Sequence, residues 1–183
     1  MGHVEYVLYD ADGNIKTYLQ SDNQVVDRGD NCVMAYAFNP SDTAGTDFCV
    51  SNSNGFRFIG IGNATATIGP EARTLTNQAT TVATTTNDGL MAMRTDNTLV
   101  FTNSTDGGTV VIATESPFTF TAGVNNTTVL SAGLFDATCT ASAGVCTAYA
   151  SPQNMFSVQT ISVAVAGGDS LSVTWTITVG NSS

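Results

Sequence analysis

Hydrophobic and polar residues alternate most regularly between residues 171 and 179. Leu171, Val173, Trp175, Ile177 and Val179 occupy the odd positions of this segment, and Ser or Thr occupies every even position. Successive side chains of a β-strand point to opposite faces, so this period of two predicts a strand with one apolar face and one hydroxyl-bearing face. We expect Trp175 and its odd-numbered neighbours to lie in the core.

Shorter segments of the same kind recur along the chain. Residues 4–9 and 15–19 are expected to form an N-terminal β-hairpin, because Asp12-Gly13 between them favours a tight turn. The segment 32–38 suits a buried strand or a short helix, and residues 63–88 are expected to be a long loop with edge pairing. Further strands are predicted at residues 56–62, 90–94, 98–102, 109–113, 118–121, 128–134 and 155–165, those between 90 and 121 as a meander.

No window of comparable length has the 3.6-residue period of a helix, so the pattern predicts an all-β protein. Many short strands separated by turn signals are typical of an antiparallel β-sandwich or jelly roll. A length of 183 residues suits one domain, spanning residues 1–183, with residues 1–40 as a hairpin or arm that reaches a neighbour. The expected core residues are Phe58, Leu134, Phe135, Leu171, Val173, Trp175 and Ile177.

Charge is scarce, since only 11% of residues are charged against 42% that are hydrophobic. Thr, Ser, Asn and Gly fill the remaining positions, a mixture that suits strands joined by tight turns. The formal net charge of −10 opposes binding to nucleic acid, which requires a positive surface. No secretory signal and no segment of roughly 20 apolar residues are present, so a membrane-spanning protein is not expected.

The four cysteines form two local pairs, Cys32 with Cys49 and Cys139 with Cys146. Neither spacing matches a zinc ribbon or a Cys-x-x-Cys redox motif. Two short disulfides would suit a protein that works in an oxidising environment. Four buried free thiols in a protein made in the cytoplasm are an equally good interpretation.

Candidate chemistry is sparse. His3 is the single histidine, and its place beside the amino terminus suits a solvated side chain better than a catalytic base. The sequence has no Gly-x-Ser-x-Gly nucleophile motif and no Walker loop. We therefore expect no catalytic, metal-binding or cofactor-binding residues and no enzyme activity, with a glycan hydrolase built on a hidden pair of carboxylates as the alternative.

Two segments carry a resemblance to known proteins. The first is Gly133-Leu134-Phe135-Asp136, and the second is Gly168-Asp169-Ser-Leu171-Ser-Val173-Thr-Trp175-Thr-Ile177. Together with the N-terminal hairpin, they resemble small structural proteins of tailed phages and related viruses, in which a Gly-Leu-Phe-Asn/Asp motif precedes such a closing strand. The matches cover roughly half of the chain, and Ser131 stands where the pattern has Glu.

The resemblance implies a virion structural protein, made in the host cytoplasm and placed on the outer capsid surface. The leading hypothesis is a capsid decoration (cement) protein that binds the major capsid protein and copies of itself, as a homotrimer. The first alternative is a tail tube, baseplate or fibre component, and the second is a cell-surface adhesin or filament subunit. No cofactor, nucleic acid or membrane partner is implied.

Overall fold

The computed structural model describes residues 2–26, 33, 56–63, 65, 93–95, 99–104, 107–114, 117–120, 127–135, 139–142, 145–149 and 155–180. These residues form twelve β-strands, and all the strand pairs among them are antiparallel. The predicted all-β class is confirmed. The strands are β1 (Gly2–Tyr9), β2 (Ile15–Val25), β3 (Phe58–Gly62), β4 (Met93–Thr95), β5 (Leu99–Ser104), β6 (Gly107–Ala113), β7 (Phe118–Thr119), β8 (Thr127–Phe135), β9 (Cys139–Ser142), β10 (Val145–Tyr149), β11 (Met155–Val165) and β12 (Ser170–Gly180).

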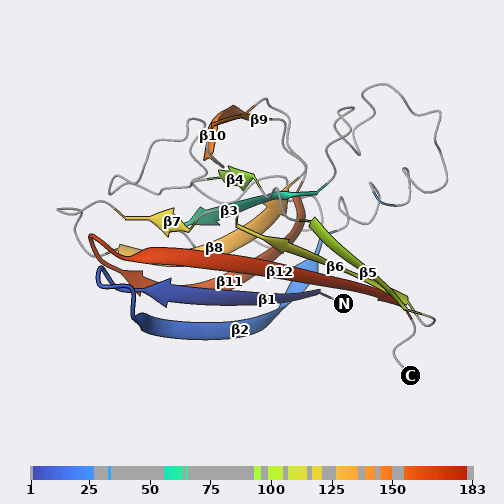
Figure 1. Cartoon of the computed structure of the whole chain (residues 1–183), viewed down its shortest axis with the longest axis horizontal. Coiled ribbons are helices and arrows are strands. Elements are labelled where there is room, and N and C mark those ends of the chain that lie inside the picture. The colour runs from blue at the N-terminus through green and yellow to red at the C-terminus, as the bar shows by residue number, and fades with distance from the viewer. Residues whose placement is uncertain are drawn as a thin grey trace.

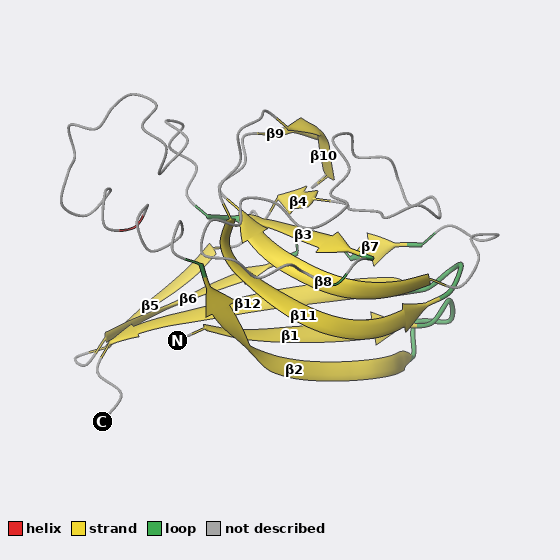
Figure 2. Cartoon of the chain, turned by 180° about the vertical axis from the view of Figure 1, so that it is seen from behind, coloured by secondary structure: helices red, strands yellow, loops and turns green. Residues whose placement is uncertain are grey.

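The strands follow one another in the order β5-β6-β12-β1-β2-β11-β8-β3-β4-β10-β9, and β7 pairs with β12 beside this path. Strand β2 connects the two parts of the order, because it pairs with β1 along most of its length while Gln24 and Val25 pair with β11. Figure 1 shows β12, β1 and β2 side by side, and Figure 2 shows β11 and β8 on the opposite side of the molecule.

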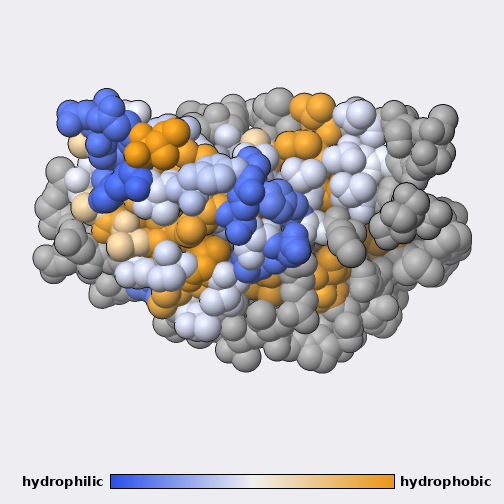
Figure 3. Space-filling model, turned by 90° about the horizontal axis from the view of Figure 1, so that it is seen from below, coloured by the Kyte–Doolittle hydropathy of each residue, from blue (hydrophilic) through white to orange (hydrophobic). Residues whose placement is uncertain are grey.

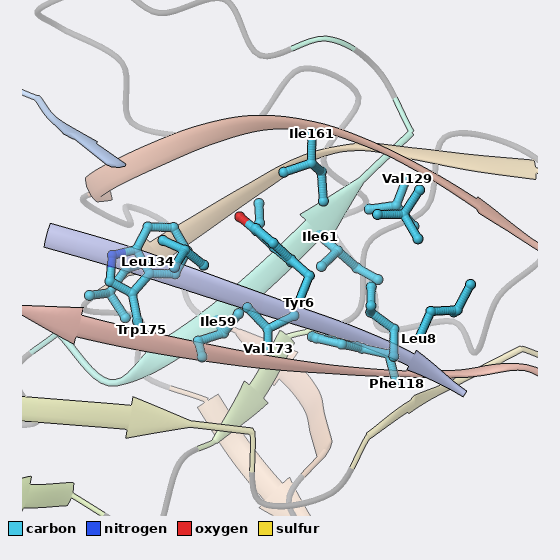
Figure 4. Packing of buried hydrophobic residues seen from close by; sticks show 14 of the residues in the cluster. Tyr6, Leu8, Ile59, Ile61, Phe118, Val129, Leu134, Ile161, Val173 and Trp175 are labelled. Carbon is cyan, nitrogen blue, oxygen red and sulfur yellow. The ribbon is translucent and has the colours of Figure 1, made fainter. Parts of the chain in front are cut away.

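Both parts of the sheet contribute side chains to one buried cluster (Figure 4). Full burial of one large apolar side chain stabilises a fold by about 1.5–3 kcal/mol, so this cluster is the main source of stability. The strands from β5 to β2, together with β7 and the residue after it, provide Val4, Tyr6, Leu8, Ile112, Phe118, Phe120, Leu171, Val173 and Trp175. Strands β3, β8 and β11 provide Ile59, Ile61, Val129, Ala132, Leu134, Phe156, Ile161, Val163 and Val165.

The residues expected in the core fall into two buried groups and one partly buried position. Leu134, Leu171, Val173 and Trp175 are fully buried in the main cluster, and Ile177 is partly buried against it. Phe58 and Phe135 are also buried, but they pair with each other across β3 and β8 on the face opposite to Leu134. The part of the sheet that contains β3 and β8 is therefore buried on both faces around Phe135.

The N-terminal hairpin is present, and its turn is held by Asp10. The Oδ1 atom of Asp10 accepts hydrogen bonds from the backbone N–H groups of Asp12 (3.0 Å) and Asn14 (2.8 Å), and Gly13 adopts a φ of 86°. That this hairpin reaches a neighbour as an arm stays a prediction. Strand β1 pairs with β12 from Gly2 to Tyr9 and buries three side chains in the cluster, so the hairpin is an integral part of the sheet.

The expected meander is wrong. Among the residues described between 90 and 121, only β5 and β6 pair with each other, whereas β4 pairs with β3 and β10, and β7 pairs with β12. Strands β9 and β10 were not predicted. The predicted segments at residues 32–38 and 63–88 lie outside the described residues, apart from residues 33, 63 and 65.

Candidate interaction surface

The outward side of β1 and β2 carries the largest group of charged and polar side chains that the structure describes. Buried and half-buried positions alternate along β1, so Val4 points into the core while His3 and Glu5 point outward. Between Thr17 and Asp22 of β2 the exposed positions are the even ones, Tyr18, Gln20 and Asp22. We call the outward side chains of His3, Glu5, Tyr18, Gln20 and Asp22 the hairpin face.

Strand register brings these five residues together. Glu5 lies opposite Gln20 of β2 and Thr174 of β12, and His3 lies opposite Asp22 and Thr176 in the same way. Directly opposite side chains in an antiparallel pair are close enough to interact. Two rows of polar side chains therefore cross three adjacent strands.

Glu5 is the centre of a hydrogen-bond network. Its Oε1 atom accepts a hydrogen bond from the Tyr18 hydroxyl at 3.1 Å and from Nε2 of Gln20 at 2.8 Å. His3 lies near two carboxylates, with 3.9 Å to Glu5 and 3.8 Å to Asp22, which are ion-pair distances rather than hydrogen bonds. The network holds an aromatic ring half-exposed at a fixed place on the surface.

Desolvation and the acceptor Glu5 together raise the pKa of the Tyr18 hydroxyl. A tyrosine hydroxyl is neutral at physiological pH, so Tyr18 acts there as a hydrogen-bond donor. Since Tyr18 is 50% exposed, its ring presents apolar area to solvent beside the carboxylate. An exposed aromatic with a polar tip is a common element of protein contact surfaces.

The neighbouring strands extend this surface without charge. Ser172, Thr174 and Thr176 alternate with the buried residues of β12, and the hydroxyls of Thr109 and Thr178 lie 3.3 Å apart across β6 and β12. Figure 3 shows hydrophilic residues gathered at one end of the molecule and in a band across its middle, with hydrophobic residues between them. The surface is suited to contact with another molecule through hydroxyls and a few charges.

Charge is concentrated on the hairpin. Of the eight Asp, Glu, Lys and Arg residues that the structure describes, five lie between residues 2 and 26. Within the described ranges, no three His, Cys, Asp or Glu side chains are grouped so that they could hold a metal ion, and no helix is long and apolar enough to cross a membrane. The arrangement provides hydrogen-bond donors and acceptors for binding, and we derive no reaction from it.

A second charged group lies at the turn between β11 and β12. Asp169 is almost completely buried, and its Oδ2 atom accepts hydrogen bonds from Nζ of Lys16 at 2.7 Å and from the backbone N–H of Ala166 at 2.8 Å. The backbone of Asp169 also contacts Phe120, whose N–H donates to its carbonyl oxygen at 3.0 Å. These bonds fix a turn, which is a structural role.

The predicted disulfides stay predictions. Cys32 and Cys49 lie outside the described residues. In the β9–β10 hairpin the backbone places Cys146 opposite Ala141 and Cys139 opposite Tyr149. Thiol titration of the unfolded, unreduced protein would count the free cysteines.

The residues of the hairpin face were not singled out from the sequence. His3 was interpreted as a solvated side chain, and Glu5, Tyr18, Gln20 and Asp22 were assigned only to strands. Alternation within each strand would have placed them outward, but the partner strand and its register determine which of them meet. That register joins segments far apart in sequence and leaves no local signal.

No family model, curated protein or solved structure matches the chain significantly. The functional conclusion therefore depends on the surface and on the residue patterns themselves.

Proposed function

We propose that this chain is a structural component of a virus particle, most specifically a decoration protein on the outer shell. The first support is the resemblance carried by the Gly133-Leu134-Phe135 motif and the closing strand. Two residues of the motif, Gly133 and Leu134, have different roles in packing. Leu134 enters the main cluster, while a Cβ atom at Gly133 would lie 2.9 Å from the Phe135 ring and 3.1 Å from Sδ of Met155.

We also infer that the fold is a two-layer antiparallel β-sandwich of the jelly-roll type. One layer is β5-β6-β12-β1-β2 and the other contains β11, β8 and β3, with the shared cluster between them. Strand β2 changes from one layer to the other at Gln24 and Val25. Sandwiches of this kind expose broad sheet faces, which are suitable for flat contacts with a shell.

The main support for the proposal is the composition of the outer face of β12, β1 and β2. It combines half-buried hydroxyls with one half-exposed tyrosine and two carboxylates, Glu5 and Asp22, and the described residues there include no arginine. Such a surface binds through area and hydrogen bonds, and its negative charge favours a partner with basic side chains. A contact of standard size buries about 800 Å² on each partner, and repetition over a shell multiplies the total stabilisation.

In this proposal the partners are the major capsid protein and other copies of the chain, with a homotrimer as the oligomer implied by the resemblance. Stabilisation would come from contacts that bridge neighbouring shell subunits. No cofactor and no nucleic acid are needed for that role. The protein would be made in the host cytoplasm and added to the assembled particle.

The test is binding of the purified chain to shells that lack it. We expect saturable binding at hundreds of copies per particle, together with a higher temperature of shell disruption. Glu5→Arg should weaken binding, because it reverses the charge at the centre of the hairpin face. Asp12→Arg, which makes the same change of charge in the exposed turn between β1 and β2, is the matched control and should bind as the natural chain does.

Copy number separates the proposal from its alternatives. A few copies per particle, located at the tail, would favour a tail tube, baseplate or fibre component. Failure to bind any shell, combined with presence on a cell surface, would favour an adhesin or filament subunit. Either result would overturn the decoration role.

A further inference from the structure

Among the residues that the structure describes, no strand pairs with the second edge of β2 between Ile15 and Asn23. Strand β2 pairs with β1 on one side from Ile15 to Asn23, whereas on the other side it pairs with β11 only at Gln24 and Val25. A side-chain hydrogen bond of 2.7 Å from Gln159 to Ser21 marks the place where β11 diverges. In Figures 1 and 2, β2 lies at the margin of the layer formed with β1 and β12.

This edge lacks most of the devices that protect natural edge strands. An unpaired edge offers backbone N–H and C=O groups to any other strand, and proteins block such edges with proline, bulges or lysines. Residues 15–23 contain no proline, and both the one lysine and the one register shift against β1 occur at the start of the strand, at Lys16, which leaves residues 17–23 without these devices. The edge is also accessible, since Ile15 is 65% exposed and the Asp22 side chain 95% exposed.

The sequence of this edge is complementary to itself about Leu19. If a second copy of β2 runs antiparallel with Leu19 opposite the partner's Leu19, then Lys16 lies opposite the partner's Asp22. The half-exposed ammonium group of Lys16, which already pairs with Asp169, would then be shared between the two carboxylates. In the same register Tyr18 lies opposite the partner's Gln20, and Thr17 lies opposite the partner's Ser21. Each of these contacts occurs twice, because the arrangement has two-fold symmetry.

Other registers lose this complementarity. A shift by one residue places exposed side chains opposite inward ones. A shift by two residues in either direction places Lys16 opposite Gln20 or Gln24, which removes both ion pairs. The register centred on Leu19 is therefore the one in which outward side chains lie opposite outward side chains and Lys16 lies opposite the partner's Asp22.

We propose that two copies of this chain associate through their β2 edges, antiparallel and with Leu19 on the two-fold axis. The layer β5-β6-β12-β1-β2 then continues into the same layer of the second copy. The inference needs no virus and no shell, so it stands apart from the proposed function. This two-fold dimer also differs from the homotrimer, because among three copies only two can pair through their β2 edges and the third edge would stay unpaired.

The first test is the mass of the full chain in solution over a concentration series. We expect a two-chain species. Asp22→Lys places two lysines opposite each other at both ends of the contact. Since one exposed ion pair typically contributes ~0.2–1 kcal/mol and two are replaced, the dissociation constant should rise about tenfold. Asp12→Lys changes the net charge equally but lies in the turn, so it should leave the dissociation constant unchanged.

The second test fixes the register by disulfide trapping. Residues directly opposite in a strand pair are within disulfide reach, whereas residues offset by two positions are not. Tyr18→Cys mixed with Gln20→Cys should give a cross-link between positions 18 and 20, identified by peptide mass spectrometry. Either variant alone should give no cross-link at its own position.

Two results would overturn the inference. One is a single-chain or three-chain mass at all concentrations. The other is a two-chain mass in which the Tyr18→Cys and Gln20→Cys mixture gives no cross-link between these positions. The readout by peptide distinguishes the engineered cysteines from the four native ones.

Discussion

The Nζ atom of Lys16 lies 2.7 Å from the Oδ2 atom of Asp169, joining the beginning of β2 to the beginning of β12. The two turns beside this pair also touch. A Cβ atom at Gly168, in the β11–β12 turn, would lie 3.0 Å from the Cβ atom of Ala11 in the β1–β2 turn. One end of the molecule is therefore closed by an ion pair and by close packing of two turns.

Replacement of Asp169 by Ala should lower the free energy of unfolding by about 2–4 kcal/mol, because hydrogen bonds to charged groups contribute ~1.5–3 kcal/mol each. The expected loss is smaller than the sum for two such hydrogen bonds, because Lys16 is half-exposed and water can replace Asp169 as its partner. Urea unfolding followed by circular dichroism measures the change. A loss below about 0.5 kcal/mol would contradict the structural role, and Asp12→Ala in the exposed turn is the control.

Gly168→Ala should destabilise the fold more than Gly13→Ala. Both glycines have positive φ angles, 94° and 86°, so both substitutions carry the backbone penalty of roughly 1–2 kcal/mol. Only Gly168 also faces a close neighbour, since nothing lies within 4 Å of a Cβ atom at Gly13. Equal losses of stability for the two variants, measured by thermal unfolding, would mean that Ala11 moves aside at no energetic cost.

Trp175→Ala should lower the free energy of unfolding by about 3–5 kcal/mol, the usual effect of removing a large buried aromatic. Trp175 is fully buried and lies between Val4 of β1 and Ile112 of β6. Thr176→Ala, one residue away on the outward face, should change stability by less than about 1 kcal/mol. Similar losses for both variants would contradict the assignment of faces.

Tyr6→Phe should leave the fold intact and raise the free energy of unfolding by about 1 kcal/mol. The Tyr6 hydroxyl is buried and has no hydrogen-bond partner among the residues that the structure describes. Phenylalanine fills the same space without the unpaired polar group. A loss of more than about 1 kcal/mol in urea unfolding would indicate that the hydroxyl is hydrogen-bonded.

The same tyrosine predicts a pH effect. Burial raises the pKa of Tyr6, so the folded state keeps a proton that the unfolded state releases above its ordinary pKa of 10.0. The contribution to stability is complete below pH 10 and is lost as the pH rises beyond it, by up to about 1.4 kcal/mol per pH unit. Tyr6→Phe should lack this part of the alkaline decline, and identical declines would contradict the burial of the hydroxyl.

The sequence predicts the fold best where alternation is strict. Residues 171–179 and the Asp12-Gly13 hairpin were expected as strands, and β12, β1 and β2 occupy those positions. Strands β9 and β10 were missed because the segment from Cys139 to Cys146 consists mainly of small residues without alternation. Local patterns of this kind are informative only where polarity alternates from one residue to the next.

Long-range pairing could not be predicted. Nothing in residues 2–9 specifies β12 as their partner, although the two strands pair along all of β1. Irregularities in β11 add a second obstacle, since its register with β8 shifts between Met155 and Ser157 and again between Thr160 and Val163. Each shift changes which positions face inward, so Phe156 and Ile161 are both in the core despite their opposite parity.

The pairing of β1 with β12 has a consequence for folding order. Leu8 and Leu171 lie opposite each other although more than 160 positions separate them in the chain. A hairpin by itself is marginally stable in water, so β1 and β2 must wait for β12 before their apolar face is covered. Contacts of such long sequence separation make folding slow. During synthesis, the apolar side chains of β1 would therefore stay exposed until β12 has been made, and a chaperone that shields this strand should increase the yield of folded protein.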